Sequence, residues 1–430
     1  MPKILNVFLL TLLPCYLPAQ QIIKRFVKSN TFPVAAIHPD STDFSDLEPI
    51  GATIGNAEIV MLGEQSHGDG ATFLAKARLI KYLHEEKGFN VLAFESDFFA
   101  LNHGWKSPGK DSSGLNKLIA GNIYPIWTKA EQLKDFFYSY IPGTYGTSRP
   151  LIVSGFDNQL HGQHSIDTLK NYLDNYLKQH NLKFRLSENY RSEFVPFIDS
   201  LVTLKPSSNI PKLKRFEQLI DTILSQSVNS DENDFGIMLL HNLKEYSREC
   251  QYLHTHFYKA FVIRDRQMAK NLNWLAETRF PGEKIIVWAA SGHIMKSMFT
   301  AAAEGESPEI IYPLGKFFTD NAQNREKTYV IGFTSETGSF GILGRNIREV
   351  SPVHRRGFET WIDKRYDFAF TDFKLFNIRN PGFSEPFPMK GRGHWSTSLP
   401  WSQAFDGVFY IRNMFPSDFL KSGGKPVQNN

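Results

Sequence analysis

The chain has few cysteines and no large excess of charge. Two of its 430 residues are cysteine, and Cys15 falls in an N-terminal stretch that we expect to be removed, which leaves Cys250 alone. A single cysteine excludes an intramolecular disulfide framework and a zinc site built from several cysteines. Lys and Arg number 48 and Asp and Glu 44, a net charge of +4 at pH 7 with no long basic run. So small a bias gives no support for a nucleic-acid partner.

Long apolar runs are scarce as well. The N-terminal run, residues 4–13, follows Lys3 and precedes a small-residue cleavage site at 17–20, and it is too short to span a bilayer. We therefore expect residues 1–20 to be a cleaved signal peptide, and the mature protein to be periplasmic or secreted without stable membrane insertion. Cys15 leaves open a second interpretation, a lipoprotein. Pro14 disfavours it, because a lipoprotein signal needs a small residue directly before the cysteine.

Several catalytic motifs are missing. The sequence contains no G-x-S-x-G, no H-E-x-x-H, no P-loop and no G-x-G-x-x-G. A serine nucleophile of the α/β-hydrolase kind is therefore unsupported, as are the zinc-protease and nucleotide-binding classes that the other motifs mark. Hydrolysis by water, activated by a histidine or by a metal, stays open.

The composition, 41% hydrophobic and 21% charged, is that of a globular protein. Short apolar runs at 58–63 and 90–95 flank a segment whose apolar residues recur every three or four positions, which predicts a strand, a helix and a parallel strand. Further strands are predicted at 151–155, 284–289, 328–333 and 406–411. The fold class is therefore α/β: a mainly parallel sheet sandwiched by helices, with a helical insertion subdomain and a small C-terminal α/β region.

We expect the chain to divide as follows: signal peptide 1–20, N-terminal part of the α/β core 21–160, helical insertion 161–279, remainder of the core 280–335, small C-terminal α/β region 336–415 and flexible tail 416–430.

Polar clusters follow three of the predicted strands, at 63–70, 95–97 and 291–293. Because ligands bind beyond the carboxyl ends of the strands in an open parallel sheet, these clusters are expected to share one cleft. The candidate catalytic residues are Glu64, His67, Glu95 and His293. A histidine among carboxylates suits a general base, since the carboxylates orient the ring and raise its basicity.

The same four side chains could also bind zinc or iron, which accept imidazole and carboxylate ligands. Asp69 is expected to cap the following helix.

These residues resemble a known family. The stretch 59–97, with its L-G-E-x-x-H-G turn and F-E-S-D strand end, is similar to the erythromycin esterase family. Further matches follow in the same order: Trp127–Glu131, Gly155–Asp157, Arg264–Ala269 and Trp288–His293, with later strands at Tyr329–Phe333 and Phe405–Tyr410. The resemblance covers about residues 40–415.

The resemblance implies hydrolysis of the lactone ester of a macrolide, without a cofactor or a required metal. On the matching positions, His67 would be the general base that activates water, and Glu64 and Glu95 would orient and polarise it. His293 would position the substrate or stabilise the oxyanion. The substrate-binding residues implied are Lys76, Glu131 and Arg264.

Two departures from the family pattern bear on the substrate. Ala290 stands where the family has its first histidine of W-A-H-N-x-H, and Lys76 stands where it has an arginine. Two alternatives therefore stay open: a secreted esterase or lactonase on a different substrate, and a periplasmic haem- or metal-binding protein of related fold. The sequence leaves the oligomeric state undetermined.

Overall fold

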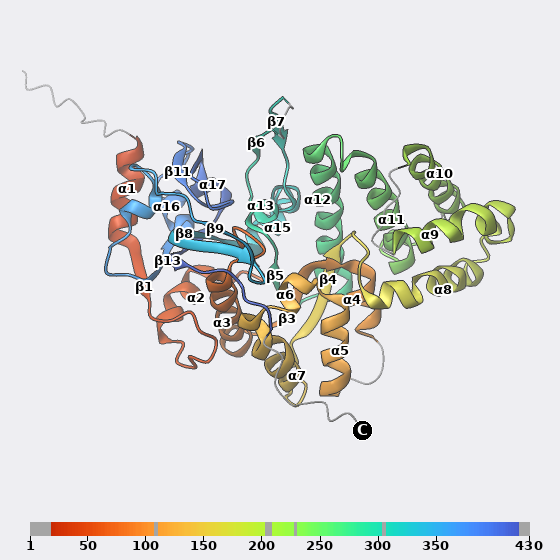
Figure 1. The fold of residues 1–430 in the computed structure, drawn as a ribbon, viewed down its shortest axis with the longest axis horizontal. Coiled ribbons are helices and arrows are strands. Elements are labelled where there is room, and N and C mark those ends of the chain that lie inside the picture. The colour runs from red at the N-terminus through yellow and green to blue at the C-terminus, as the bar shows by residue number, and fades with distance from the viewer. Residues whose placement is uncertain (1–18, 107–110, 203–208, 228–229, 303–306, 421–430) are drawn as a thin grey trace, which may run out of the picture.

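The computed structural model describes residues 19–106, 111–202, 209–227, 230–302 and 307–420. Residues 1–18 of the expected signal peptide and residues 421–430 of the expected tail lie outside this range. A large sheet occupies the middle of the molecule in Figure 1, with a lobe of helices to its right. No helix of the described residues is long and apolar enough to cross a membrane.

The strands of the large sheet are β1 (Thr31–Val34), β2 (Ile59–Leu62), β3 (Phe89–Asp97), β4 (Ile152–Asp157), β5 (Lys284–Trp288), β8 (Thr328–Ile342), β9 (Arg345–Glu349), β10 (Phe368–Asp372) and β13 (Gly407–Met414), and two small hairpins add β6 (Phe299–Ala301), β7 (Glu309–Ile311), β11 (Phe387–Met389) and β12 (Thr397–Leu399).

The helices are α1 (Ala19–Asn30), α2 (Glu48–Ile54), α3 (Gly70–Lys87), α4 (Phe98–Gly104), α5 (Ser112–Asn122), α6 (Pro125–Thr128), α7 (Ile141–Thr144), α8 (Gln163–Gln179), α9 (Val195–Leu201), α10 (Ile210–Gln226), α11 (Phe235–Tyr252), α12 (Phe257–Trp274), α13 (Ser291–Ile294), α14 (Leu314–Thr319), α15 (Ala322–Lys327), α16 (Phe373–Arg379) and α17 (Trp401–Ala404).

The sheet runs in the order β1-β10-β13-β8-β2-β5-β3-β4, and β9 pairs with β8. The six strands from β13 to β4 are mutually parallel, and β10 pairs antiparallel with both of its neighbours. The six strands predicted from the sequence are these six parallel strands, so the prediction of a mainly parallel α/β sheet is confirmed.

Helices cover both faces of the sheet. In β2 all four side chains are buried: Val60 and Leu62 join one core with α3, and Ile59 and Met61 join a second core with α12. A strand that is buried on both faces has a continuous run of apolar residues, so β2 could be predicted from the sequence.

The helices α8 to α11 form the lobe at the right of Figure 1. They have a core of their own, which includes Leu173, Phe216 and Leu243. The following helix, α12, instead packs Met268 and Leu272 into the core beneath the sheet. The middle of α12 reaches the strand ends where the polar clusters were expected, because Arg264 contacts Glu95 and Asp157 there.

The C-terminal residues complete the sheet and then continue past it. Strand β13 pairs with β8 in the middle of the sheet, and β10 extends that sheet outward. Beyond β13, Pro416 pairs with Asp69 and Phe419 pairs with Ala130. The paired chain therefore extends beyond residue 415, where the flexible tail was expected to begin.

Candidate active site

The four predicted catalytic residues lie at the carboxyl ends of neighbouring strands in the sheet. Glu64 follows β2, Glu95 lies near the end of strand β3, and His293 lies in the short helix α13 after β5. The strand order β2-β5-β3 makes these three strands neighbours, and all three run parallel. The charges of both Glu95 and His293 act on the pKa of His67, so the structure brings the four side chains into one electrostatic neighbourhood.

The Glu64 carboxylate is fully buried and held by three donors. Its Oε1 accepts hydrogen bonds from His67 Nδ1 at 2.8 Å and from the Trp127 indole N–H at 3.1 Å. Its Oε2 accepts a hydrogen bond from Lys76 Nζ at 2.9 Å. Three donors from separate elements leave this carboxylate one orientation, which in turn fixes the ring of His67.

His67 presents its other nitrogen outward. A carboxylate only accepts hydrogen bonds, so a neutral His67 carries its proton on Nδ1 and leaves Nε2 with a free lone pair. The side chain is 35% exposed, so a small molecule can reach it. Burial lowers the pKa of His67, but the Glu64 hydrogen bond and the Glu95 charge outweigh it, and the net pKa is raised above 6.5.

Lys76 has no exposed side-chain surface. Its ammonium group pairs with Glu64 and lies 3.9 Å from the ring centre of Trp288. Burial lowers the pKa of Lys76 to about 8, against the opposing effect of Glu64. In this position Lys76 acts on Glu64 and is out of reach of a bound substrate.

Glu95 lies between two cations. Its Oε1 is 2.9 Å from Arg264 Nη2 and 3.2 Å from His293 Nε2, and its Oε2 accepts a hydrogen bond from the Ala290 backbone N–H at 2.9 Å. Burial raises the pKa of Glu95, but the charge and hydrogen bond of His293, with Arg264, hold it well below its usual range. Arg264 also pairs with Asp157 at 2.6 Å, so it cross-links the ends of β3 and β4.

His293 is enclosed by carboxylates. Nδ1 is 2.6 Å from Asp265 and Nε2 faces Glu95, while the ring stacks on Phe261 at a centroid distance of 4.6 Å. Burial lowers the pKa of His293, but the charges of Asp265 and Glu95 raise it to about 10. His293 is therefore a cation at neutral pH, stabilised by two carboxylates although Arg264 is also close.

Two residues that hold this site were not assigned a role from the sequence. Asp265 lies in the R-D-x-x-M-A segment, directly after the candidate Arg264, and Trp127 opens the W-x-x-x-E segment. Both segments were noted for their resemblance alone, because neither spacing nor composition shows which side chain of a helix will face a strand end.

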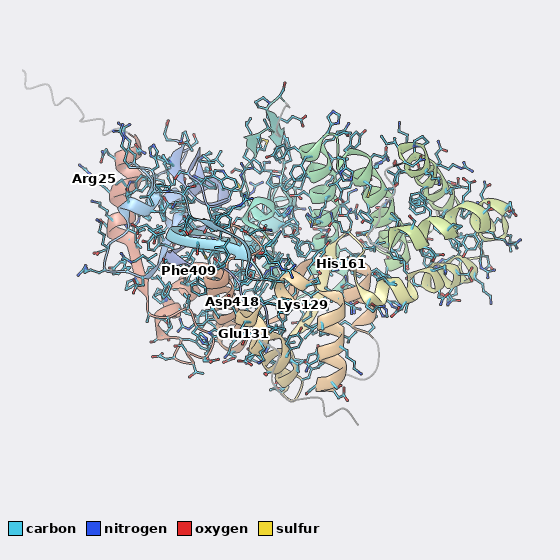
Figure 2. The ribbon with its side chains drawn as sticks, in the orientation of Figure 1. Arg25, Lys129, Glu131, His161, Phe409 and Asp418 are labelled. Carbon is cyan, nitrogen blue, oxygen red and sulfur yellow. The ribbon has the colours of Figure 1, made fainter. Side chains whose placement is uncertain are left out.

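Glu131 lies against the chain that follows β13. It begins the 3-10 turn Glu131–Leu133, and its backbone N–H donates to the Asp418 carbonyl at 2.9 Å. Figure 2 shows Glu131, Lys129 and Asp418 together at the lower middle of the molecule. Glu131 lines a cavity of about 270 Å³ together with Asp135 and Phe136.

The turn that carries Glu64 and His67 is clamped by distant segments. Asp69 occupies the N-cap position of α3, but the prediction that it caps the helix is wrong for its side chain. The carboxylate instead accepts hydrogen bonds from the Ser66 N–H at 2.9 Å and from His394 Nε2 at 2.8 Å. On the other side of the turn, the Gly68 carbonyl accepts a hydrogen bond from the Ser417 N–H at 2.7 Å.

The site residues are paired chiefly with one another. Within the described ranges, no three His, Cys, Asp or Glu side chains are grouped so that they could hold a metal ion. Arranged as they are, the groups offer one nitrogen base that solvent can reach, and beside it a buried cation flanked by carboxylates.

Known proteins are similar to this chain in sequence and in fold. A sequence model of the family described as erythromycin esterase matches residues 84–413. The chain is 24% identical over 411 residues to "Putative hydrolase YbfO" of Bacillus subtilis (strain 168), covering 87% of this chain and 88% of that protein. It is 30% identical over 117 residues to "Erythromycin esterase type II" of Escherichia coli, 26% of each chain.

The fold has a solved counterpart. A mutant of an erythromycin esterase, crystallised in its open conformation, aligns with a TM-score of 0.63 at 18% identity, over 90% of this chain and 98% of that one. The family match covers more than half of the chain and includes Glu95, Arg264 and His293. The similarity to a putative hydrolase supports hydrolase activity. By the family match, the chain belongs to the erythromycin esterase family.

Proposed function

We propose that this protein hydrolyses carboxylic esters with a water molecule activated by His67. The observation that carries the proposal is the hydrogen bond from His67 Nδ1 to the fixed Glu64 carboxylate, which leaves Nε2 as a base at the accessible edge of the site. A base in this setting accelerates attack by water by roughly 10²- to 10⁴-fold.

The reaction has two proton transfers at one atom. Nε2 of His67 takes a proton from water while the water oxygen bonds to the acyl carbon, and the carbonyl oxygen becomes an oxyanion. When the intermediate collapses, the bond to the alkoxide oxygen breaks and that oxygen takes the proton back from Nε2. A lactone thus becomes one hydroxy acid, with one water consumed.

The oxyanion needs a positive neighbour. His293 is protonated at neutral pH, and Arg264 lies beside it, so the site holds two cations on the side of Glu95. Positive charges that are already in place stabilise developing negative charge without reorganisation. We assign this role to His293, and to Arg264 the role of holding Glu95 and His293 in place.

Macrolide lactones are the proposed substrate class. The support is the family membership and the partial match to an erythromycin esterase of Escherichia coli. Ala290 and Lys76, which depart from the family pattern, make other esters or lactones the alternative.

The test is mass spectrometry of a macrolide panel incubated with the protein, with and without EDTA, beside the variants His67→Ala and His254→Ala. His254 is an exposed histidine of the loop before α12, so its variant is the matched control. We expect a mass gain of one water molecule with the wild type and with His254→Ala, and none with His67→Ala.

Retained hydrolysis in a folded His67→Ala protein would contradict the proposed mechanism. Hydrolysis of simple aryl esters but of no macrolide would keep the mechanism and move the substrate to another class. No hydrolysis of any ester, together with a Soret band in the purified protein, would favour the haem-binding alternative.

A further inference from the structure

The loop 390–395 lies against the turn 64–69, which carries Glu64 and His67 and is called the catalytic turn after their proposed role. The Gln65 side-chain amide donates to the Lys390 carbonyl at 2.6 Å and to the Gly393 carbonyl at 3.0 Å. The pair between His394 and Asp69 fixes the loop from its other end. Arg392 therefore stands on a loop tied at both ends to the turn that carries Glu64 and His67.

Arg392 also reaches the turn that carries His293. Its Cγ would lie 3.7 Å from a Cβ placed on Gly292, so the aliphatic part of the side chain packs on this turn. Its guanidinium carbon lies 4.1 Å from the ring centre of Phe299, at the start of β6. Arg392 thus borders the site on the side of the proposed oxyanion cation.

The guanidinium of Arg392 has a phenol beside it, that of Tyr258. Burial lowers the pKa of Arg392, and the charge and hydrogen bond of Tyr258 on α12 oppose that effect. In the described residues no aspartate or glutamate lies within ion-pair distance of this guanidinium, whereas Arg264, in the same site, pairs with two carboxylates.

A half-buried cation without an anion is an unusual arrangement. A guanidinium has five N–H donors, and a phenol accepts only one or two hydrogen bonds. Stacking over Phe299 attracts the cation to the ring face and uses none of the donors. Several donors in a fork that matches a carboxylate therefore remain on a side chain that packs against the turn of Gly292.

We propose that Arg392 binds a carboxylate of the substrate, so that the preferred esters carry a free acid group near the scissile bond. The inference rests on the proposed function for its chemistry, but the binding of the carboxylate stands on the geometry alone. Tyr258 and Phe261, one turn apart on α12, would then contact the carbon chain between the acid and the ester, since Phe261 stacks on His293.

Two 4-nitrophenyl esters test the preference: the glutarate monoester, which carries a free carboxylate, and the neutral butyrate. We expect the wild type to favour the charged ester in kcat/KM. A charged hydrogen bond contributes roughly 1.5–3 kcal/mol, so Arg392→Gln should reduce that preference at least about tenfold. Arg392→Lys keeps the charge but loses the fork, and should restore only part of it.

Arg355→Gln is the control, because Arg355 is an exposed arginine outside the site. It should keep the wild-type preference. Wild-type protein that prefers the neutral ester, or an Arg392→Gln protein with an unchanged preference, would overturn the inference.

Calorimetry with glutarate separates this inference from the proposed function. If the wild type hydrolyses neither ester, the proposed function fails on these substrates, and glutarate binding decides the role of Arg392. Binding by the wild type that is lost in Arg392→Gln and kept in Arg355→Gln supports the inference. Absence of binding, or equal binding by all three proteins, overturns it.

Discussion

The buried pair of Lys76 and Glu64 gives a sharp prediction. Both side chains have no exposed surface, and their charged atoms lie 2.9 Å apart. Lys76→Met keeps the length of the side chain and its packing on Trp288 but leaves Glu64 buried without its cation. Removing one partner of a buried pair costs roughly 3–5 kcal/mol.

The expected shift in melting temperature follows from the size of the chain. With an unfolding entropy of about 2.1 cal/mol/K per residue and about 400 folded residues, 3–5 kcal/mol corresponds to a decrease in Tm of about 4–6 °C. Thermal unfolding followed by circular dichroism measures it. Lys117→Met, an exposed lysine on α5, is the control and should leave Tm unchanged.

The pH dependence carries a second signature. The pKa of Lys76 is about 8 in the folded protein and about 10.5 when unfolded, so the unfolded chain binds the proton more strongly. The contribution of Lys76 to stability is therefore lowest below pH 8 and rises between pH 8 and 10.5. The difference in Tm between the wild type and Lys76→Met should widen over this interval.

The double variant Glu64→Gln/Lys76→Met tests the cause. Removing both charges leaves no unpaired carboxylate, so the double variant should melt higher than Lys76→Met alone. If Lys76→Met melts within 1 °C of the wild type, or if the double variant melts lower than the single one, the charge pair does not stabilise the catalytic turn.

Asp265→Asn removes the charge that raises the pKa of His293 most, so this pKa should fall from about 10 towards 6.5. NMR titration of the ring measures it. An unchanged pKa would refute the role of Asp265 in keeping His293 protonated. Gly68→Ala places a Cβ 2.6 Å from the Gly341 carbonyl group, so the backbone must shift. We expect a loss of roughly 1–3 kcal/mol, seen as a lower Tm. Gly143→Ala, with open space around it, is the control, and equal Tm values for the two variants would contradict the close approach of Gly341 to Gly68.

The sequence revealed the strands that are buried on both faces. Strand β2 has four apolar residues in succession, and β5 has a similar run, because helices cover both of their faces. Strands β1 and β10 were not predicted. Strand β1 is four residues long, contains Pro33 and lies at the sheet edge, so it shows neither a long apolar run nor a clear alternation.

The part of the candidate site that lies at the ends of strands could be predicted from the sequence. Glu64, Glu95 and His293 each follow or end a predicted strand, and the parallel order brings them together. The clamp on the catalytic turn was not visible, because His394 and Ser417 approach it from more than 300 residues away. Contacts at that sequence separation leave no periodicity and no local spacing.

The two histidines of the site differ in state because their surroundings differ. His293 has a carboxylate at each ring nitrogen and almost no exposure, so it holds its proton at neutral pH and has no lone pair to accept another. His67 has one carboxylate, on Nδ1, and one third of its side chain is exposed, so its Nε2 can exchange protons with water. In the proposed mechanism, this difference between the two environments makes His67 the base and His293 the cation. The carboxylates that separate them, Glu64 and Glu95, come from the ends of two strands of one parallel sheet, so the division of roles is a consequence of the fold.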